Sequence, residues 1–139
     1  MSASRTSLLR PSTTYYDCGL LILRLWYGLL LLFGHGLGKM TNFSRMSAHF
    51  PDPLHIGSSA SLLLALLAEV VGSLLLIFGL LTRVACALII IELAVAFALV
   101  HHFKLFGQGG GELALLYIGA AVVLAFTGPG RYSVDAYRR

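Results

Sequence analysis

Four long apolar runs, separated by short polar segments, dominate the pattern of this chain. The runs extend over about 18–38, 60–81, 84–103 and 111–127. At 1.5 Å per residue, each run spans or nearly spans the roughly 30 Å hydrocarbon core of a bilayer. Backbone amides cannot stay unpaired in hydrocarbon, and the runs lack the alternation of barrel strands. The pattern therefore predicts an all-α integral membrane bundle of four transmembrane helices.

The connections between the runs differ in length. Only Thr82 and Arg83 separate the second and third runs, which predicts an antiparallel helical hairpin. After the fourth run, Gly128, Pro129 and Gly130 end the helix, and Ser133 is placed to cap a short amphipathic helix in the tail.

The first connection, residues 39–59, is much longer. Within it, Phe43, Met46 and Phe50 recur at i, i+3 and i+7, and Pro51 follows. This spacing fits a short interfacial helix, and it fits an ordinary amphipathic loop equally well.

Composition supports a membrane protein. Of 139 residues, 58% are hydrophobic and 12% are charged, whereas soluble domains carry about 25% charged residues. The length allows a single domain over residues 1–139. The basic residues form no dense patch with interleaved aromatics, which argues against nucleic-acid binding. Cys18 and Cys86 lack CxxC spacing, so we interpret them as small apolar residues.

Basic residues are distributed unequally between the two ends of the predicted bundle. Six arginines belong to one end: Arg5, Arg10, Arg83, Arg131, Arg138 and Arg139. Three basic residues belong to the other: Lys39, Arg45 and Lys104. Because basic loops stay on the cytoplasmic side, we expect both termini to be cytoplasmic, with Arg83 and Arg131 as anchors there.

Several ionisable side chains fall inside or at the edges of the apolar runs. They are Arg24, His35, Glu69, Glu92, His101, His102 and Glu112. Such groups cost several kcal/mol when they face lipid, so we expect them to point into the bundle. Small residues share their helix faces and would let helices approach closely. Three such pairs are Arg24 with Gly28, Glu69 with Gly72, and Glu112 with Gly119.

Arg24, Glu69 and Glu92 lie at similar depth from the cytoplasmic end and are expected to form one buried polar network. The network fits a functional relay. It fits equally well an ion pair of Arg24 with either glutamate that only fixes helix register.

A second layer of ionisable residues falls toward the outer face. His35, His102 and Glu112 lie there at similar depth, and helical geometry favours His102 over His101 as the residue that faces inward. Imidazole donates hydrogen bonds that a quinone carbonyl accepts, so these four residues are the candidate quinone or proton site. A metal is an alternative, which no HxxxH or ExxH spacing supports. A bis-histidine haem is another, for which His35 and His102 could supply facing imidazoles, although small bundles often contain such pairs by chance.

Several short motifs follow one another over residues 20–135. They are Arg24-Leu25 with Gly28, Phe33 to Lys39, Leu67 to Gly72, Phe78 to Arg83, Gly110 to Ala114, and Thr127 to Asp135. Their order and spacing resemble the DoxX family. The resemblance implies a small four-helix protein of a prokaryotic cytoplasmic membrane. It also implies a link to quinol oxidase and thiosulfate:quinone oxidoreductase subunits.

The resemblance carries over to individual residues. The positions that match the family's polar motif are Arg24, His35, Lys39, Glu69, Arg83, His101 or His102, Glu112 and Arg131. The family usually has one histidine where this chain has two in succession, so the matching histidine stays undecided.

These observations predict a small membrane subunit associated with quinone-linked redox chemistry in a larger complex. Its expected partners are the lipid bilayer and other membrane subunits or further copies of itself. The chain has no Cys cluster, dinucleotide fingerprint or covalent haem motif, so electrons would come from a partner or a bound quinol. The alternatives are a structural or assembly subunit, and a transporter of a small solute or protons with Glu69 and Glu92 as relays.

Overall fold

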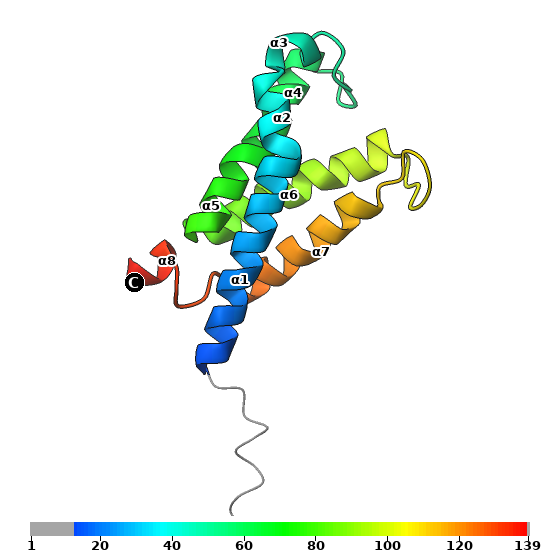
Figure 1. Ribbon diagram of the computed structural model, residues 1–139. Helices are drawn as coiled ribbons and strands as arrows, with labels where there is room; N and C mark the ends of the chain where they lie inside the picture. Colours follow the sequence, from blue (N-terminus) through cyan, green and yellow to red (C-terminus); the bar gives the residue numbers. More distant parts are fainter. Residues whose placement is uncertain (1–12, 139) are drawn as a thin grey trace, which may run out of the picture.

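The structure, a computed structural model, describes residues 13–138 and consists there of helices joined by turns and loops (Figure 1). The helices form four rods. Rod 1 is α1 (Thr13–Leu31), η2 (Leu32–Gly36) and α2 (Leu37–Thr41). Rod 2 is α4 (Ser58–Leu66), η3 (Leu67–Gly72) and α5 (Ser73–Phe78). Rod 3 is α6 (Thr82–Val95) and η4 (Ala96–Val100), and rod 4 is α7 (Glu112–Thr127). The segments η2, η3 and η4 are π-helical turns.

Three rods are long and apolar enough to cross a membrane. They cover Thr13–Thr41, Ser58–Phe78 and Thr82–Val100. Rod 4 is also apolar but has 16 residues, about 24 Å of helix. The predicted all-α membrane fold is therefore confirmed for the described residues, while the count of four spans stays a prediction.

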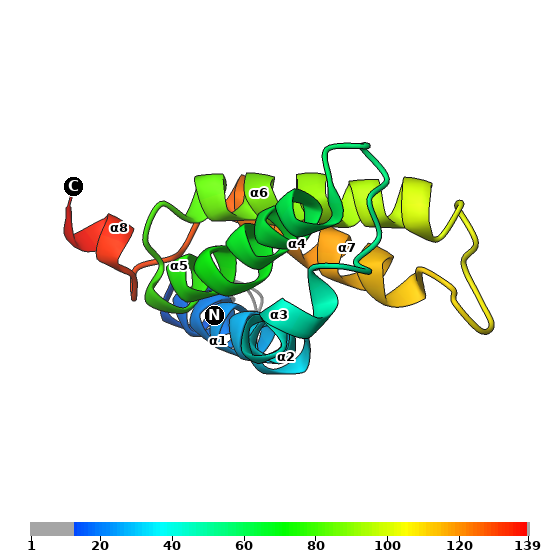
Figure 2. The same cartoon turned by 90° about the horizontal axis from the view of Figure 1, so that it is seen from above.

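The rods form two pairs. Rods 1 and 2 run side by side, as do rods 3 and 4, and the two pairs diverge in Figure 1, whereas Figure 2 shows rod 1 nearly end-on. We call the end that holds residues 42–57 and 101–111 the loop end. The opposite end, with the start of α1, the turn at 79–81 and residues 128–138, is the terminal end. The pairs separate toward the loop end, which positions the site described below.

The core lies where the rods meet. Leu31, Leu76, Ile89 and Leu124 are almost completely buried there and belong to one hydrophobic cluster. Burial of such side chains is the main favourable contribution to packing between rods of a water-soluble bundle, but in lipid close van der Waals contact takes over that role.

Glycines allow the close contacts that lipid-embedded helices need. A Cβ added to Gly28 would lie 2.6 Å from Ile77 Cγ1 and 3.1 Å from the Ser73 carbonyl oxygen. A Cβ on Gly72 would lie 3.0 Å from Ile89 Cγ1. These two glycines therefore face neighbouring rods, as predicted.

The buried face of rod 4 differs from the predicted one. Glu112 and Gly119 are exposed, and the buried residues of α7 are Ala114, Ala121 and Leu124. At 100° per residue, Ala114 lies about 200° from Glu112, so the inward face is nearly opposite the predicted one.

Two rod ends also differ from the predicted bounds. The turn between rods 2 and 3 lies at Gly79 to Leu81, and both of these residues have left-handed backbone, with φ of 65° and 47°. Rod 3 ends at Val100, before His102 and Phe103, because those two residues are also left-handed, with φ of 49° and 58°. Gly79, Leu80 and Leu81 continue the apolar run, so hydropathy could not locate the first break. At the second break, the predicted run continued through two histidines to Phe103.

The two short helices match their predictions in part. The predicted interfacial helix is a single turn, α3 (Phe43–Met46), without a side-chain cap. At the other end of the molecule, Ser133 caps α8 (Val134–Tyr137), because its Oγ accepts a hydrogen bond of 3.1 Å from the amide of Ala136. The predicted cap is confirmed.

Arg24 has main-chain partners. Its side chain is fully buried and donates to the carbonyl oxygens of Leu76, at 3.4 Å, and of Tyr132. Leu76 lies in the last turn of α5, where the free carbonyls carry partial negative charge that favours a guanidinium group. Arg24 therefore pairs with neither glutamate, and the predicted network of Arg24, Glu69 and Glu92 is not assembled. The arginine instead joins rods 1 and 2 to the C-terminal segment.

Asp135 fastens the same segment to rod 3. Its carboxylate accepts hydrogen bonds from the amides of Leu81, at 2.8 Å, and Thr82, at 3.0 Å, which are free amides at the start of α6. The Asp135 amide donates to the carbonyl of Gly79 at 2.9 Å. Burial alone raises the pKa of Asp135, but the hydrogen bonds from these amides and the charge of Arg138 outweigh it and lower the pKa.

Candidate functional site

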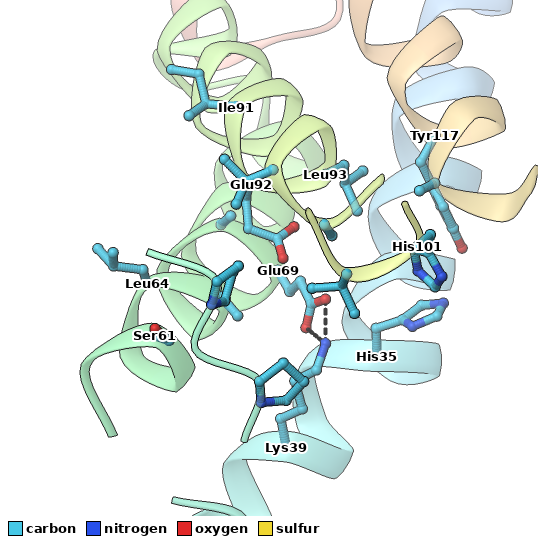
Figure 3. A pocket seen from close by; sticks show the side chains of 18 of the residues that line it. His35, Lys39, Ser61, Leu64, Glu69, Ile91, Glu92, Leu93, His101 and Tyr117 are labelled. Atoms are coloured by element: carbon cyan, nitrogen blue, oxygen red, sulfur yellow. Dashed lines mark hydrogen bonds and ion pairs between the residues drawn. The ribbon is translucent and has the colours of Figure 1, made fainter. Parts of the chain in front are cut away.

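A cavity of about 510 Å³ lies at the loop end between the diverging rod pairs (Figure 3). Most of its wall is apolar, with side chains such as Leu64, Leu67, Ile91 and Val95. Polar side chains from all four rods also line it, and they are His35, Lys39, Ser61, Glu69, Glu92, His101 and Tyr117. An apolar cavity with a few convergent polar groups is typical of a small-molecule site.

Lys39 and Glu69 form an ion pair in this cavity. Lys39 Nζ donates to both oxygens of the Glu69 carboxylate (Figure 3). Glu69 is buried on η3, as expected, but its partner is not Arg24. The contact depends on Gly36, one turn before Lys39, where an added Cβ would lie 3.1 Å from the Glu69 carbonyl oxygen. The close approach of η2 and η3 therefore brings the lysine to the glutamate.

Glu92 lies near this pair but has no partner. Its side chain is half-buried on α6 and points into the cavity (Figure 3). Its Oε2 atom is buried and has no hydrogen bond within the described part of the chain. A buried polar atom without a partner costs about 1 to 3 kcal/mol and calls for an explanation. A ligand in the cavity would supply the missing hydrogen bond.

Two histidines line the cavity. The His35 ring packs edge-on against Tyr117, with ring centroids 5.7 Å apart. The Tyr117 carbonyl in turn accepts from the hydroxyl of Tyr27 at 3.1 Å, which links rod 4 to rod 1. His101 Nδ1 lies 2.8 Å from the carbonyl oxygen of Gly109. Because a carbonyl only accepts, Nδ1 carries a proton, and in the neutral ring Nε2 is free to accept.

The predicted outer layer is only partly assembled. His35 lines the cavity, but His102 is exposed outside it, and His101 takes the inward place. The preference for His102 assumed an α-helix through both residues, whereas η4 is a π-helical turn and rod 3 ends at Val100. Glu112 is also exposed and does not line the cavity, because α7 turns its opposite face inward. The predicted inward positions of His102 and Glu112 are therefore wrong.

Sequence reasoning undervalued two residues of the site. Lys39 matches the family's polar motif and counts as a basic flank of the outer end, but it is not among the residues predicted for the site. It follows His35 by four residues and therefore lies on the same helix face. Tyr117 was not selected at all, because an aromatic residue in an apolar run gives no signal of its own. The two predicted anchors, Arg83 and Arg131, are exposed at the terminal end.

Among residues 13–138, no group of three or more His, Cys, Asp or Glu side chains is arranged to hold a metal ion.

Comparisons with known proteins place these features in a family. A family model described as DoxX matches residues 19–102, which include most of rod 1, all of rods 2 and 3, and the polar residues of the cavity that these rods carry. The chain is also similar to an uncharacterised protein of Haemophilus influenzae. The two are 40% identical over 113 residues, which cover 73% of this chain and 77% of that protein. No solved structure matches the chain.

Proposed function

This chain belongs to the DoxX family of membrane proteins, and we propose that its loop-end cavity binds the head group of a membrane quinone or quinol. The observation that carries the proposal is the unpaired carboxyl of Glu92 in an apolar cavity beside the Lys39–Glu69 pair. An apolar ligand with hydroxyl or carbonyl groups at one end would satisfy this carboxyl and fill the remaining space.

Access from the bilayer supports a lipid-soluble ligand. Leu64, Leu67 and Ile91 line the cavity and are also exposed on the outer surface, with 48%, 42% and 63% of their areas accessible. These side chains lie on rods 2 and 3, in the stretches apolar enough to cross a membrane. A ligand dissolved in the hydrocarbon could therefore reach the cavity between these rods without passing through water.

The polar groups favour the reduced form of the ligand. A hydroquinone donates through two hydroxyl groups, whereas a quinone only accepts. Glu92 and His101 Nε2 both offer acceptors, because Gly109 already occupies Nδ1 of that histidine. The ammonium of Lys39 is already engaged by both oxygens of Glu69. We therefore assign Glu92 and His101 to the two hydroxyl groups and leave Lys39 and Glu69 to hold the cavity in shape.

The proposed role is that of a subunit in a larger redox complex. The cavity can hold a quinol and accept its protons, and the electrons would pass to a redox centre of a partner subunit. In this role the chain is a single domain that crosses a prokaryotic cytoplasmic membrane four times. Both of its termini lie in the cytoplasm. A purely structural subunit would need no ligand here, and a proton or solute transporter would move its substrate without a quinone.

Quinol binding by the purified full chain tests the proposal. We expect His101→Ala to weaken binding of a short-chain hydroquinone about five-fold, the loss of roughly one hydrogen bond. Glu92→Leu should weaken it at least as much. His102→Ala and Glu112→Leu are matched controls, because these neighbours lie outside the cavity, and binding should not change.

Three outcomes would decide against the proposal. Equal losses for His101→Ala and His102→Ala would mean that the cavity is not the site. Absence of hydroquinone binding by the wild type would favour a structural subunit. Proton or solute flux through liposomes that is indifferent to quinol would favour a transporter.

A further inference from the structure

A second open cavity, of about 600 Å³, lies at the terminal end. Three separate parts of the chain form it. They are the start of α1 at Tyr16 and Asp17, the turn into α6 at 81–84, and the segment that follows α7 at 127–131, with Asp135 and Ala136 beside it. The quinone proposal makes no use of this cavity.

The acidic and basic side chains that line this terminal cavity differ in their interaction partners. Asp17 Oδ1 accepts from the amide of Arg131 at 2.9 Å, and the carboxylate of Asp135 accepts from two amides at the start of α6. Both oxygens of Asp135 and one oxygen of Asp17 therefore bind main-chain amides rather than an arginine side chain. Arg83 and Arg131 also line the cavity, and their exposed side chains take part in no ion pair among residues 13–138. Two guanidinium groups without an ion-pair partner in this range therefore border the cavity, alongside two carboxylates that bind main-chain amides.

The terminal cavity lies at the level where lipid head groups are expected. It is bordered by the first residues of α6, which begins at Thr82, and by the end of α7 at Thr127. The apolar helices α6 and α7 lie on one side of this level. The polar segment that follows α7 lies on the other. Tyr16 and Tyr132 are half exposed at the same end, and tyrosine is enriched at membrane interfaces.

We propose that the terminal cavity binds the phosphate group of an anionic phospholipid between Arg83 and Arg131. Guanidinium groups pair well with phosphate oxygens because they can donate two parallel hydrogen bonds. The acyl chains would lie along the apolar outer faces of rods 3 and 4. Free phosphate shares the head-group chemistry but lacks these chains, so the same two arginines would hold it much more weakly.

Native mass spectrometry of the detergent-solubilised full chain tests this site. With phosphatidylglycerol and phosphatidylcholine added in equal amounts, the wild type should retain phosphatidylglycerol preferentially. Each arginine near a charged lipid surface contributes roughly a five-fold preference, so Arg83→Gln/Arg131→Gln should lose most of it. The matched control is Arg45→Gln/Lys104→Gln, which removes the same charge at the loop end and should leave the preference unchanged.

Further measurements keep the test decisive if the double variant fails to fold. The wild-type preference should decline at high salt, because screening weakens exposed charge pairs, and Arg83→Lys/Arg131→Lys should retain part of it. The proposal is overturned if the wild type shows no preference for phosphatidylglycerol, or if both double variants lose it equally. It is also overturned if inorganic phosphate displaces the lipid at comparable concentration, which would identify a site for the free anion.

Discussion

The buried or half-buried side chains of Arg24, Glu69 and Glu92 are each accommodated differently. Arg24 donates to main-chain carbonyls, Glu69 accepts from Lys39, and the Glu92 carboxyl has no partner in residues 13–138. Hydropathy alone predicted that all three point inward, because lipid exposure is too costly. It could not predict their partners, since a lysine at a helix end and a carbonyl in a distant turn leave no pattern in the sequence.

The Lys39–Glu69 pair gives a first prediction. Lys39→Met leaves a buried carboxylate without its counter-ion, which should lower the free energy of unfolding by about 3 kcal/mol. Adding Glu69→Gln in the same chain should recover much of that loss, because a neutral amide is cheaper to bury than a carboxylate. Denaturation in mixed micelles measures both effects. Equal stability of Lys39→Met and the wild type would show that the pair contributes nothing.

Asp135 gives a prediction for pH dependence. Its pKa is lowered in the folded protein, so its stabilisation is present above the unfolded pKa of about 3.9 and is lost as pH falls through the folded pKa. Asp135→Asn should cost about 1 to 2 kcal/mol near neutral pH, since it weakens a helix cap. Thermal unfolding between about pH 6 and pH 3 should therefore depend less on pH in the variant. A steeper dependence would contradict this assignment.

Rods 1 and 2 show how small residues determine the distance between helices. Gly28 and Gly36 face rod 2, at positions where an added Cβ would meet main-chain atoms of Ser73 and Glu69 at 3.1 Å. The second of these contacts lies beside the Lys39–Glu69 pair, so the spacing of the rods also builds the site. Gly19, on the same α1 helix, has nothing within 4 Å of the added position.

This difference predicts unequal effects of the same substitution. Gly28→Ala should destabilise the protein by about 1 to 3 kcal/mol, because Ile77 and the Ser73 carbonyl must move. Gly19→Ala should be neutral or stabilising by up to about 1 kcal/mol, the gain in helix propensity. Thermal unfolding of the two variants in one detergent compares them directly. A larger loss for Gly19→Ala would refute the close-contact interpretation of Gly28.

The sequence was most informative for the rods and least for their ends and rotations. Long apolar runs predicted all four rods, because lipid leaves helices as the only way to pair the backbone. Gly79 marks the end of rod 2, but the start of rod 3 and its end depend on left-handed backbone at Leu81 and His102, which are not glycines. The rotation of α7 was mispredicted from Glu112, because a charged residue at the first turn of a helix can reach solvent whichever face is buried.

The molecule as a whole has two unlike ends. The loop end holds an apolar cavity with an ion pair, two histidines and an unpaired carboxyl, and the terminal end holds two exposed arginines over a polar cavity. Divergence of the rod pairs opens the first, while Arg24 and Asp135 tie the rods together at the second (Figure 1). None of this long-range arrangement was predictable from the apolar runs alone.

The arginines at the terminal end also predict orientation. Because basic residues are retained in the cytoplasm, we expect residues 42–57 to face outward. A single cysteine placed at Ser47, in a chain with Cys18→Ala and Cys86→Ala, should react with a membrane-impermeant reagent added to intact cells. A cysteine at Tyr137 should react only after the membrane is opened. The reverse pattern would mean that the protein is inserted the other way.

Photolabelling with a radioactive azido-quinone tests most directly the central claim that the loop-end cavity binds a quinone. In native membranes, we expect label in peptides covering residues 64–69 and 88–101, which line the cavity, and we expect excess unlabelled quinol to prevent it. Glu92→Leu should reduce this labelling, and Glu112→Leu should not. Label spread evenly over the lipid-facing side chains, including Trp26 and Phe126, or label that quinol does not displace, would contradict the claim.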